Sequence, residues 1–105
     1  MSKPTEKQLV NDLKTLLSDK AGENFAKPLS EFWKGCTREQ CPIVGCKGVW
    51  FSADGGSIMK DTDGEYPCDY YTGYKHPEFQ KFLDKYENYV YLTWYDPGTP
   101  LIMFF

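Results

Sequence analysis

Three cysteines spaced five residues apart, Cys36, Cys41 and Cys46, are the residues whose types and spacing best predict a chemical role for this chain. Cys68 and the only histidine, His76, follow within reach of a shared site. Thiolate and imidazole groups are common ligands of structural zinc, which four of them surround as a tetrahedron. The cluster therefore predicts a structural zinc site built from four of these five residues.

The same spacing leaves other interpretations of the thiols open. The cysteine loop over residues 36–46 lacks the tight Cys-x2-Cys pairs that mark many zinc sites and dithiol oxidoreductases. Two of the thiols could form a disulfide if the protein resided in an oxidising compartment. A small thiol-dependent redox enzyme that uses the loop from Cys36 to Cys46 is a further alternative. The last is that the cysteines are reduced and packed as small apolar side chains.

His76 has a second explanation in its position directly before Pro77. Proline suits the first position of a helix, where no intrahelical hydrogen bond is lost, and Glu78 complements the positive end of the helix dipole. A helix over residues 77–87 is therefore expected to begin here, with its apolar residues on one face. A role for His76 as the general base of a thiol would require a geometry that spacing alone does not reveal.

The N-terminal segment predicts another amphipathic helix, over residues 5–20. Thr5 and Gln8 have the form of a capping box, and Gly22 is a suitable residue to end the helix. The apolar stripe of this helix is expected to face the core and comprises Leu9, Val10, Leu13, Leu16 and Leu17.

Two hairpins are predicted from short apolar runs that flank turn residues. The first, over residues 49–60, turns at Asp54-Gly55-Gly56, and the second, over residues 89–105, turns at Asp96-Pro97-Gly98. Because the chain ends on the apolar run 101–105, that strand must be central in the sheet, covered by another element or paired with a partner. These elements predict a single α+β domain, with an antiparallel sheet of about four strands packed by two helices.

Tyrosine is unusually abundant, with eight tyrosines beside seven phenylalanines and three tryptophans. A tyrosine can bury its ring while its hydroxyl stays in water, and the residue is enriched at protein interfaces. In the strand predicted from residue 89, alternate positions place tyrosines on the face opposite the apolar residues. The predicted binding surface comprises Tyr70, Tyr71, Tyr74, Tyr89, Tyr91 and Tyr95.

Composition and charge argue against several classes of function, although aromatic stacking on single-stranded nucleic acid stays open. The formal net charge is −3 and the lysines are scattered singly, whereas binding to phosphate backbones needs clustered positive charge. No apolar run approaches the roughly 20 residues of a membrane span. The polar N-terminus lacks the apolar core of a signal peptide, so we expect an intracellular, cytoplasmic protein, with a virion as the other setting.

The function expected from these features is that of a non-enzymatic protein-interaction or assembly module. The tyrosine surplus and the apolar C-terminus favour a protein partner or self-association, and nucleic acid and membrane are disfavoured. Such a chain would serve as an accessory or structural component of a larger complex, including a viral or phage particle. The thiol-dependent enzyme described above is the alternative.

Overall fold

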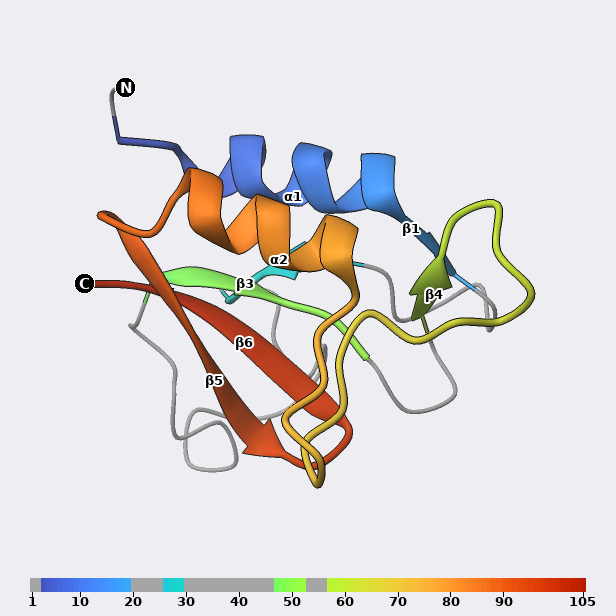
Figure 1. Cartoon of the computed structure of the whole chain (residues 1–105). Coiled ribbons are helices and arrows are strands. Elements are labelled where there is room, and N and C mark those ends of the chain that lie inside the picture. The colour runs from blue at the N-terminus through green and yellow to red at the C-terminus, as the bar shows by residue number, and fades with distance from the viewer. Residues whose placement is uncertain (1–2, 20–25, 30–46, 53–56) are drawn as a thin grey trace, which may run out of the picture.

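The computed structural model describes residues 3–19, 26–29, 47–52 and 57–105 (Figure 1). Within them the chain forms two helices and two antiparallel sheets, which confirms the predicted α+β class. The elements in chain order are α1 (Glu6–Leu16), β1 (Leu17–Asp19), β2 (Lys27–Pro28), β3 (Gly48–Trp50), β4 (Ser57–Met59), α2 (Pro77–Lys85), β5 (Val90–Asp96) and β6 (Thr99–Phe104).

The larger sheet has four strands in the order β2-β3-β6-β5, and the smaller one pairs β1 with β4. Figure 1 shows both helices on the same face of the larger sheet, with the β1–β4 ribbon beyond the end of α1. Helix α1 contacts β2 and β3, whereas α2 contacts β5 and α1. The described part of the chain is thus a sheet with one helical layer, and no helix in it is long and apolar enough to cross a membrane.

Helix α1 begins where the capping box predicted. The Thr5 hydroxyl accepts a hydrogen bond from the Gln8 amide at 3.1 Å, and the Gln8 side chain accepts one from the Thr5 amide at 2.9 Å. The predicted end at residue 20 is wrong, because the backbone of Leu17 is extended and begins β1. The Leu16 carbonyl accepts from the Lys60 amide at 2.8 Å instead, so strand pairing ends the helix.

The predicted hairpin over residues 49–60 is wrong in its pairing. Strand β3 pairs with β2 and β6, while β4 pairs with β1 in the other sheet. The ends of the two runs are close together, since the Ser57 amide donates to the Ser52 carbonyl at 2.8 Å. The turn residues 54–56 lie outside the described residues. Each run therefore pairs with a strand that is distant in sequence, and most of its apolar side chains are buried there.

The C-terminal hairpin is confirmed. Strands β5 and β6 pair antiparallel, and at their turn the Gly98 amide donates to the Asp96 carboxylate at 3.0 Å. Strand β6 lies between β3 and β5, so the apolar end of the chain is central in the sheet. Among the alternatives for this strand, insertion into its own sheet is the one that the structure shows.

Both faces of the central strand are buried. Ile102 joins the main core beneath the helices, whereas Leu101 and Met103 belong to a second cluster with Trp50 and Leu29. Successive side chains of a strand point to opposite faces, which accounts for this division. The main core also contains side chains from both helices, namely Leu9, Val10, Leu13, Phe79 and Phe82.

Helix α2 runs from Pro77 to Lys85, two residues shorter at its C-terminal end than the predicted range of 77–87. His76 is its N-cap residue and Pro77 occupies the first turn, as the His-Pro pair predicted. Phe79 and Phe82 are buried on one face, and the Phe79 ring lies edge-on to Phe51 with the ring centres 5.7 Å apart. This contact joins α2 to the segment that follows β3.

We predict that Gly48→Ala lowers the free energy of unfolding by at least about 3 kcal/mol, as measured by urea denaturation. A Cβ at Gly48 would lie 2.2 Å from the Ile102 carbonyl oxygen on the neighbouring strand, and the residue has φ +153°. Gly64→Ala is the matched control, because Gly64 also has positive φ but no atom within 4 Å of the added Cβ. Its loss should be about 1 kcal/mol. Equal losses in the two variants would contradict the steric argument.

Deletion of residues 101–105 should unfold the chain, because it removes most of the central strand, leaves β5 without a neighbour and leaves β3 paired only with the short strand β2. Far-UV circular dichroism and resistance to protease measure this outcome. Phe105→Ser is the control, since Phe105 is 78% exposed and follows β6, and it should leave the fold intact. A truncated chain that keeps its spectrum but changes its oligomeric state would show that the strand serves a partner instead.

Candidate functional site

The loop that precedes α2 presents the largest group of exposed aromatic side chains in the described residues. Its two ends pair as an isolated antiparallel bridge between Cys68 and Lys75. The Asp69 amide donates to the Tyr74 carbonyl at 2.9 Å, and the His76 amide donates to the Pro67 carbonyl at 2.8 Å. Backbone pairing thus closes the base of this loop.

Asp69 holds the tip of the loop through its carboxylate. One oxygen accepts from the Tyr71 amide at 3.4 Å and the other from the Thr72 hydroxyl at 2.7 Å. The Thr72 hydroxyl oxygen in turn accepts from the Tyr74 amide at 3.2 Å. Gly73 supplies the positive φ of 73° that the turn requires, and its amide donates to the Asp69 carbonyl at 3.0 Å. These bonds give the loop one conformation from which its tyrosines project.

The electrostatics of the tip follow from the same contacts. The hydrogen bond from the Thr72 hydroxyl, followed by those from the backbone, holds the pKa of Asp69 below its usual value. The carboxylate is therefore ionised at neutral pH, and the loop carries a fixed negative charge between its tyrosines.

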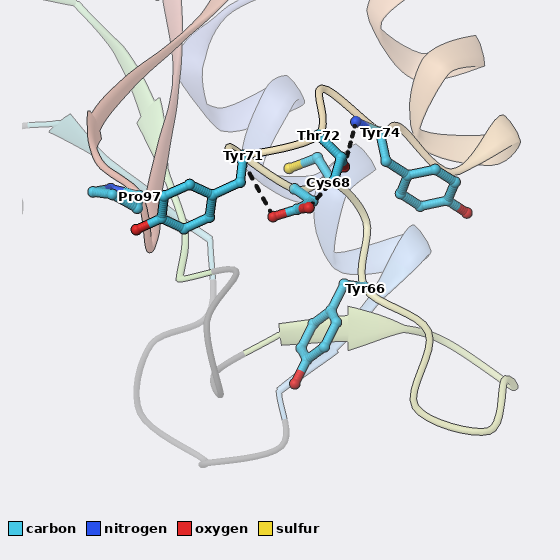
Figure 2. A pocket seen from close by; sticks show the side chains of 7 residues that line it. Tyr66, Cys68, Tyr71, Thr72, Tyr74 and Pro97 are labelled. Atoms are coloured by element: carbon cyan, nitrogen blue, oxygen red, sulfur yellow. Dashed lines mark hydrogen bonds between the residues drawn. The ribbon is translucent and has the colours of Figure 1, made fainter.

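A surface depression of about 560 Å³ lies against this loop. Figure 2 shows Tyr66 and Tyr71 on well-separated parts of the segment, with Tyr66 before the bridge at Cys68 and Tyr71 at the tip of the loop. Pro97 comes from the distant turn between β5 and β6. The described residues that line the depression are Tyr66, Cys68, Asp69, Tyr71, Thr72, Tyr74 and Pro97, which we call the tyrosine pocket.

Aromatic contacts fix the loop against the larger sheet. The Tyr70 ring lies edge-on to Trp94 of β5, with ring centres 5.5 Å apart, and edge-on to Tyr71 at 5.4 Å. Trp94 packs against the main core, so Tyr70 lies on the helical side of the sheet. Strand β5 shifts its register between Trp94, which lies opposite Pro100, and Asp96, which lies opposite Thr99.

The six tyrosines of the predicted binding surface do not all share one place. Tyr70, Tyr71 and Tyr74 lie on the loop and are exposed. Tyr91 projects from the face of β5 opposite Trp94, where its ring lies 5.1 Å from Phe105. Tyr95 is exposed on the same strand, whereas Tyr89 is partly buried against the core.

Sequence reasoning missed four residues of the tyrosine pocket, which are Tyr66, Asp69, Thr72 and Pro97. The run from Asp69 to Gly73 carries a usable signal, because aspartate and glycine at such spacing are typical of a side-chain-stabilised turn. Tyr66 and Pro97 had no comparable signal. They join the pocket through the bridge at Cys68 and through the position of the β5–β6 turn.

Cys68 is the one predicted zinc ligand among the cysteines that lies in the described residues. Its thiol is reduced and only 3% exposed, and burial raises its pKa to about 12. A thiol in this environment stays protonated at neutral pH, so its nucleophilicity and its tendency to bind metal are low. Cys36, Cys41 and Cys46 lie outside the described residues, and the zinc, disulfide and redox interpretations of that loop stay predictions.

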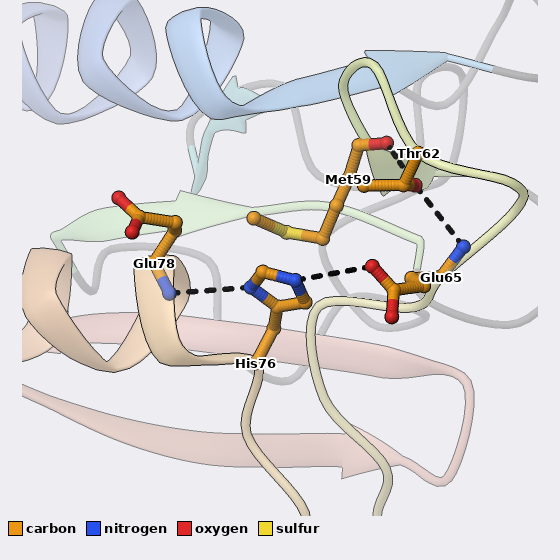
Figure 3. Close-up of polar contacts among 5 residues, drawn as sticks. All are labelled: Met59, Thr62, Glu65, His76 and Glu78. Carbon is orange, nitrogen blue, oxygen red and sulfur yellow. Dashed lines mark hydrogen bonds and ion pairs between the residues drawn. The ribbon is translucent and has the colours of Figure 1, made fainter.

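The imidazole of His76 is held in place by the side chain of Glu65 and by the backbone amide of Glu78 (Figure 3). Its Nδ1 accepts from the Glu78 amide at 3.2 Å, and its Nε2 lies 3.3 Å from the Glu65 carboxylate. Thr62 positions Glu65, because its hydroxyl donates to the Met59 carbonyl at 2.7 Å and accepts from the Glu65 amide at 3.2 Å. Both ring nitrogens of His76 therefore have partners, and the residue caps α2 while fixing the preceding turn.

No group of three or more histidine, cysteine, aspartate or glutamate side chains that could hold a metal ion occurs among residues 3–19, 26–29, 47–52 and 57–105. Cys68 is one end of the Cys68–Lys75 bridge, and His76 directly follows the other end. Cys68 is nevertheless buried in the core, whereas His76 forms hydrogen bonds with Glu65 and Glu78. Their roles in the described structure are those of a packed thiol and a helix cap.

A second polar cluster lies between the helices. The Tyr86 hydroxyl donates a short hydrogen bond to Asp12 of α1, and the Lys85 ammonium lies 3.5 Å from the same carboxylate. Burial, together with the bond to Asp12, raises the pKa of the Tyr86 hydroxyl. Each member of this cluster is paired, so we assign it to the packing of α1 against α2.

Comparison with known proteins adds no relative to this description: no protein family model, no curated protein and no solved structure matches the chain.

We predict that Cys68 resists alkylation at neutral pH in the folded protein and reacts in denaturant. Burial keeps the thiol protonated, and only the thiolate is reactive. Peptide mapping by mass spectrometry after a timed iodoacetamide treatment distinguishes Cys68 from the other three thiols. Rapid labelling of Cys68 in the folded state would contradict the assignment.

Stability should also fall at alkaline pH because of this thiol. Its pKa of about 12 in the folded state exceeds its ordinary value of 9.0, so between these values the unfolded chain releases a proton that the folded chain keeps. Below about pH 9 ionisation of the thiol does not change the free energy of unfolding. Above that pH the free energy of unfolding decreases by at most about 1.4 kcal/mol per pH unit. Cys68→Ala should flatten this slope in urea titrations, and an unchanged slope would contradict the burial of an ionisable thiol.

Proposed function

We propose that this protein is a non-enzymatic interaction module, and that its partner is a protein that contacts the tyrosine pocket. The observation that carries the proposal is the exposure of three tyrosines on one hydrogen-bonded loop and of a fourth, Tyr66, just before the base of that loop. Tyr66, Tyr70, Tyr71 and Tyr74 are between 45% and 79% exposed. Large aromatic side chains gain much from burial, and tyrosine is among the residues that dominate binding energy at interfaces.

The conformation of the loop supports the same proposal. The bonds to Asp69 and Thr72 and the bridge at Cys68 hold the backbone before any partner arrives. A partner would then bind without a large entropic cost of ordering this segment. The buried Cys68 side chain and the contact of Tyr70 with Trp94 connect the loop to the core, so the rings project from a supported position.

The role within a larger assembly, as an accessory or structural component, extends this proposal. It follows from the small size of the chain and from a surface suited to a protein partner, with a viral or phage particle as one such assembly. The internal position of β6 means that the apolar C-terminus does not contribute to the argument.

The alternative function, a thiol-dependent enzyme, would depend on the 36–46 loop. Within the described residues the only cysteine is Cys68, whose burial and raised pKa make it a poor nucleophile. No observation on the described residues favours this alternative over an interaction module.

Selection of peptides from a random display library tests the proposal on the full chain. Peptides recovered on the wild-type protein are synthesised, and their affinities are measured by fluorescence anisotropy. We expect the double variant Tyr71→Ala/Tyr74→Ala to bind them at least about tenfold more weakly, because two exposed rings of the pocket are lost. Both residues are exposed, so the melting temperature should change little.

Tyr91→Ala is the matched control, since Tyr91 is 41% exposed but lies on β5 away from the pocket. It should bind the recovered peptides like the wild type. The proposal fails if no peptide is enriched, or if the double variant and the control bind the peptides equally well.

A further inference from the structure

The tyrosine pocket combines aromatic rings with a single fixed anionic group. Three of its seven described lining residues are tyrosines, and Asp69 supplies the carboxylate. None of those seven is a lysine or an arginine. Lys75 is the nearest cation in the loop sequence, and it lies at the base of the loop, opposite Cys68.

A pocket of this composition suits a positively charged ligand. The face of an aromatic ring carries negative electrostatic potential and attracts ammonium and guanidinium groups placed over it. A carboxylate at the same place adds a direct ion pair. Neutral apolar ligands would gain from the rings but would leave the carboxylate without a new partner while removing it from water.

The Asp69 carboxylate has a fixed position before any cation binds. Its two oxygens already accept bonds from the Tyr71 amide and the Thr72 hydroxyl, which fix its position. The same bonds keep it ionised at neutral pH. A carboxylate has about four acceptor positions, so capacity for an additional donor remains.

We infer that the tyrosine pocket receives a lysine or arginine side chain from a basic segment of the partner protein. The inference rests on the proposed function and specifies the chemistry of the partner. Net charge supports it, because a chain with a formal net charge of −3 attracts basic partners at long range. In the complex the ammonium or guanidinium group pairs with Asp69, and the aliphatic stem lies against the tyrosine rings.

Titration of the ¹⁵N-labelled full chain with defined peptides tests the inference by nuclear magnetic resonance. The probes are short capped peptides with a single arginine, a single lysine or, as the neutral analogue, norleucine. We expect the two cationic peptides to shift amide resonances within residues 69–74, with dissociation constants on the order of millimolar. The norleucine peptide should bind at least about tenfold more weakly, and added salt should weaken only the cationic peptides.

Three variants locate the effect. Asp69→Asn keeps an acceptor for the Tyr71 amide and suits the turn, so it should fold yet lose at least about tenfold in affinity for the cationic peptides. Tyr71→Phe keeps the aromatic face and should retain binding, whereas Tyr71→Leu should lose it. Equal binding of norleucine and lysine peptides, or unchanged binding by Asp69→Asn, would overturn the inference.

The result is separable from that of the library selection. Recovered peptides that need Tyr71 and Tyr74 but contain no lysine or arginine would overturn the cationic ligand while the proposed interaction module stands. A selection that enriches nothing would overturn the proposed function, and the titration with cationic peptides would still decide whether the pocket has affinity for them.

Discussion

The burial of β6 on both faces is the constraint on which the described structure depends. Ile102 faces the helices, and Leu101 and Met103 face the second cluster, so the strand is stable only between two neighbours. Close approach of β3 is part of this arrangement, since Gly48 lies directly against the Ile102 carbonyl. Helices α1 and α2 then cover one face of the sheet, and the hairpin to β5 places the turn at Pro97 beside the loop that carries the tyrosines.

The loop before α2 acquires its properties from its two ends. Cys68 at its base is buried in the core. Asp69 beside it accepts hydrogen bonds from three successive residues of the tip. Because the base is buried and the tip is hydrogen-bonded, exposed tyrosines can be presented in one arrangement. Such pre-organisation reduces the entropic cost of binding, which gives the exposed rings more value in an interface than they would have on an unstructured loop.

Neighbouring reactive residues need not act together, as Cys68 and His76 illustrate. They lie around the same backbone bridge, yet desolvation suppresses ionisation of the thiol while the imidazole is occupied by Glu65 and by the Glu78 amide. Their chemistry is decided by what surrounds each side chain. Asp69 differs from both, because its carboxylate is ionised and lies in a depression lined by tyrosines.

Local sequence was enough to predict the features that depend on neighbours within a few residues: the capping box at Thr5, the helix start at His76-Pro77 and the turn between β5 and β6. Each is a local hydrogen bond or a fixed φ angle, which residue types specify directly. The packed fold was needed to show that α1 ends at Leu16, that β3 and β4 join different sheets, and that Tyr66 and Pro97 line one depression with Asp69. These outcomes depend on which strands, distant in sequence, bury the most apolar surface when they pair. Residue types within a short segment do not specify this choice, because it involves the whole chain.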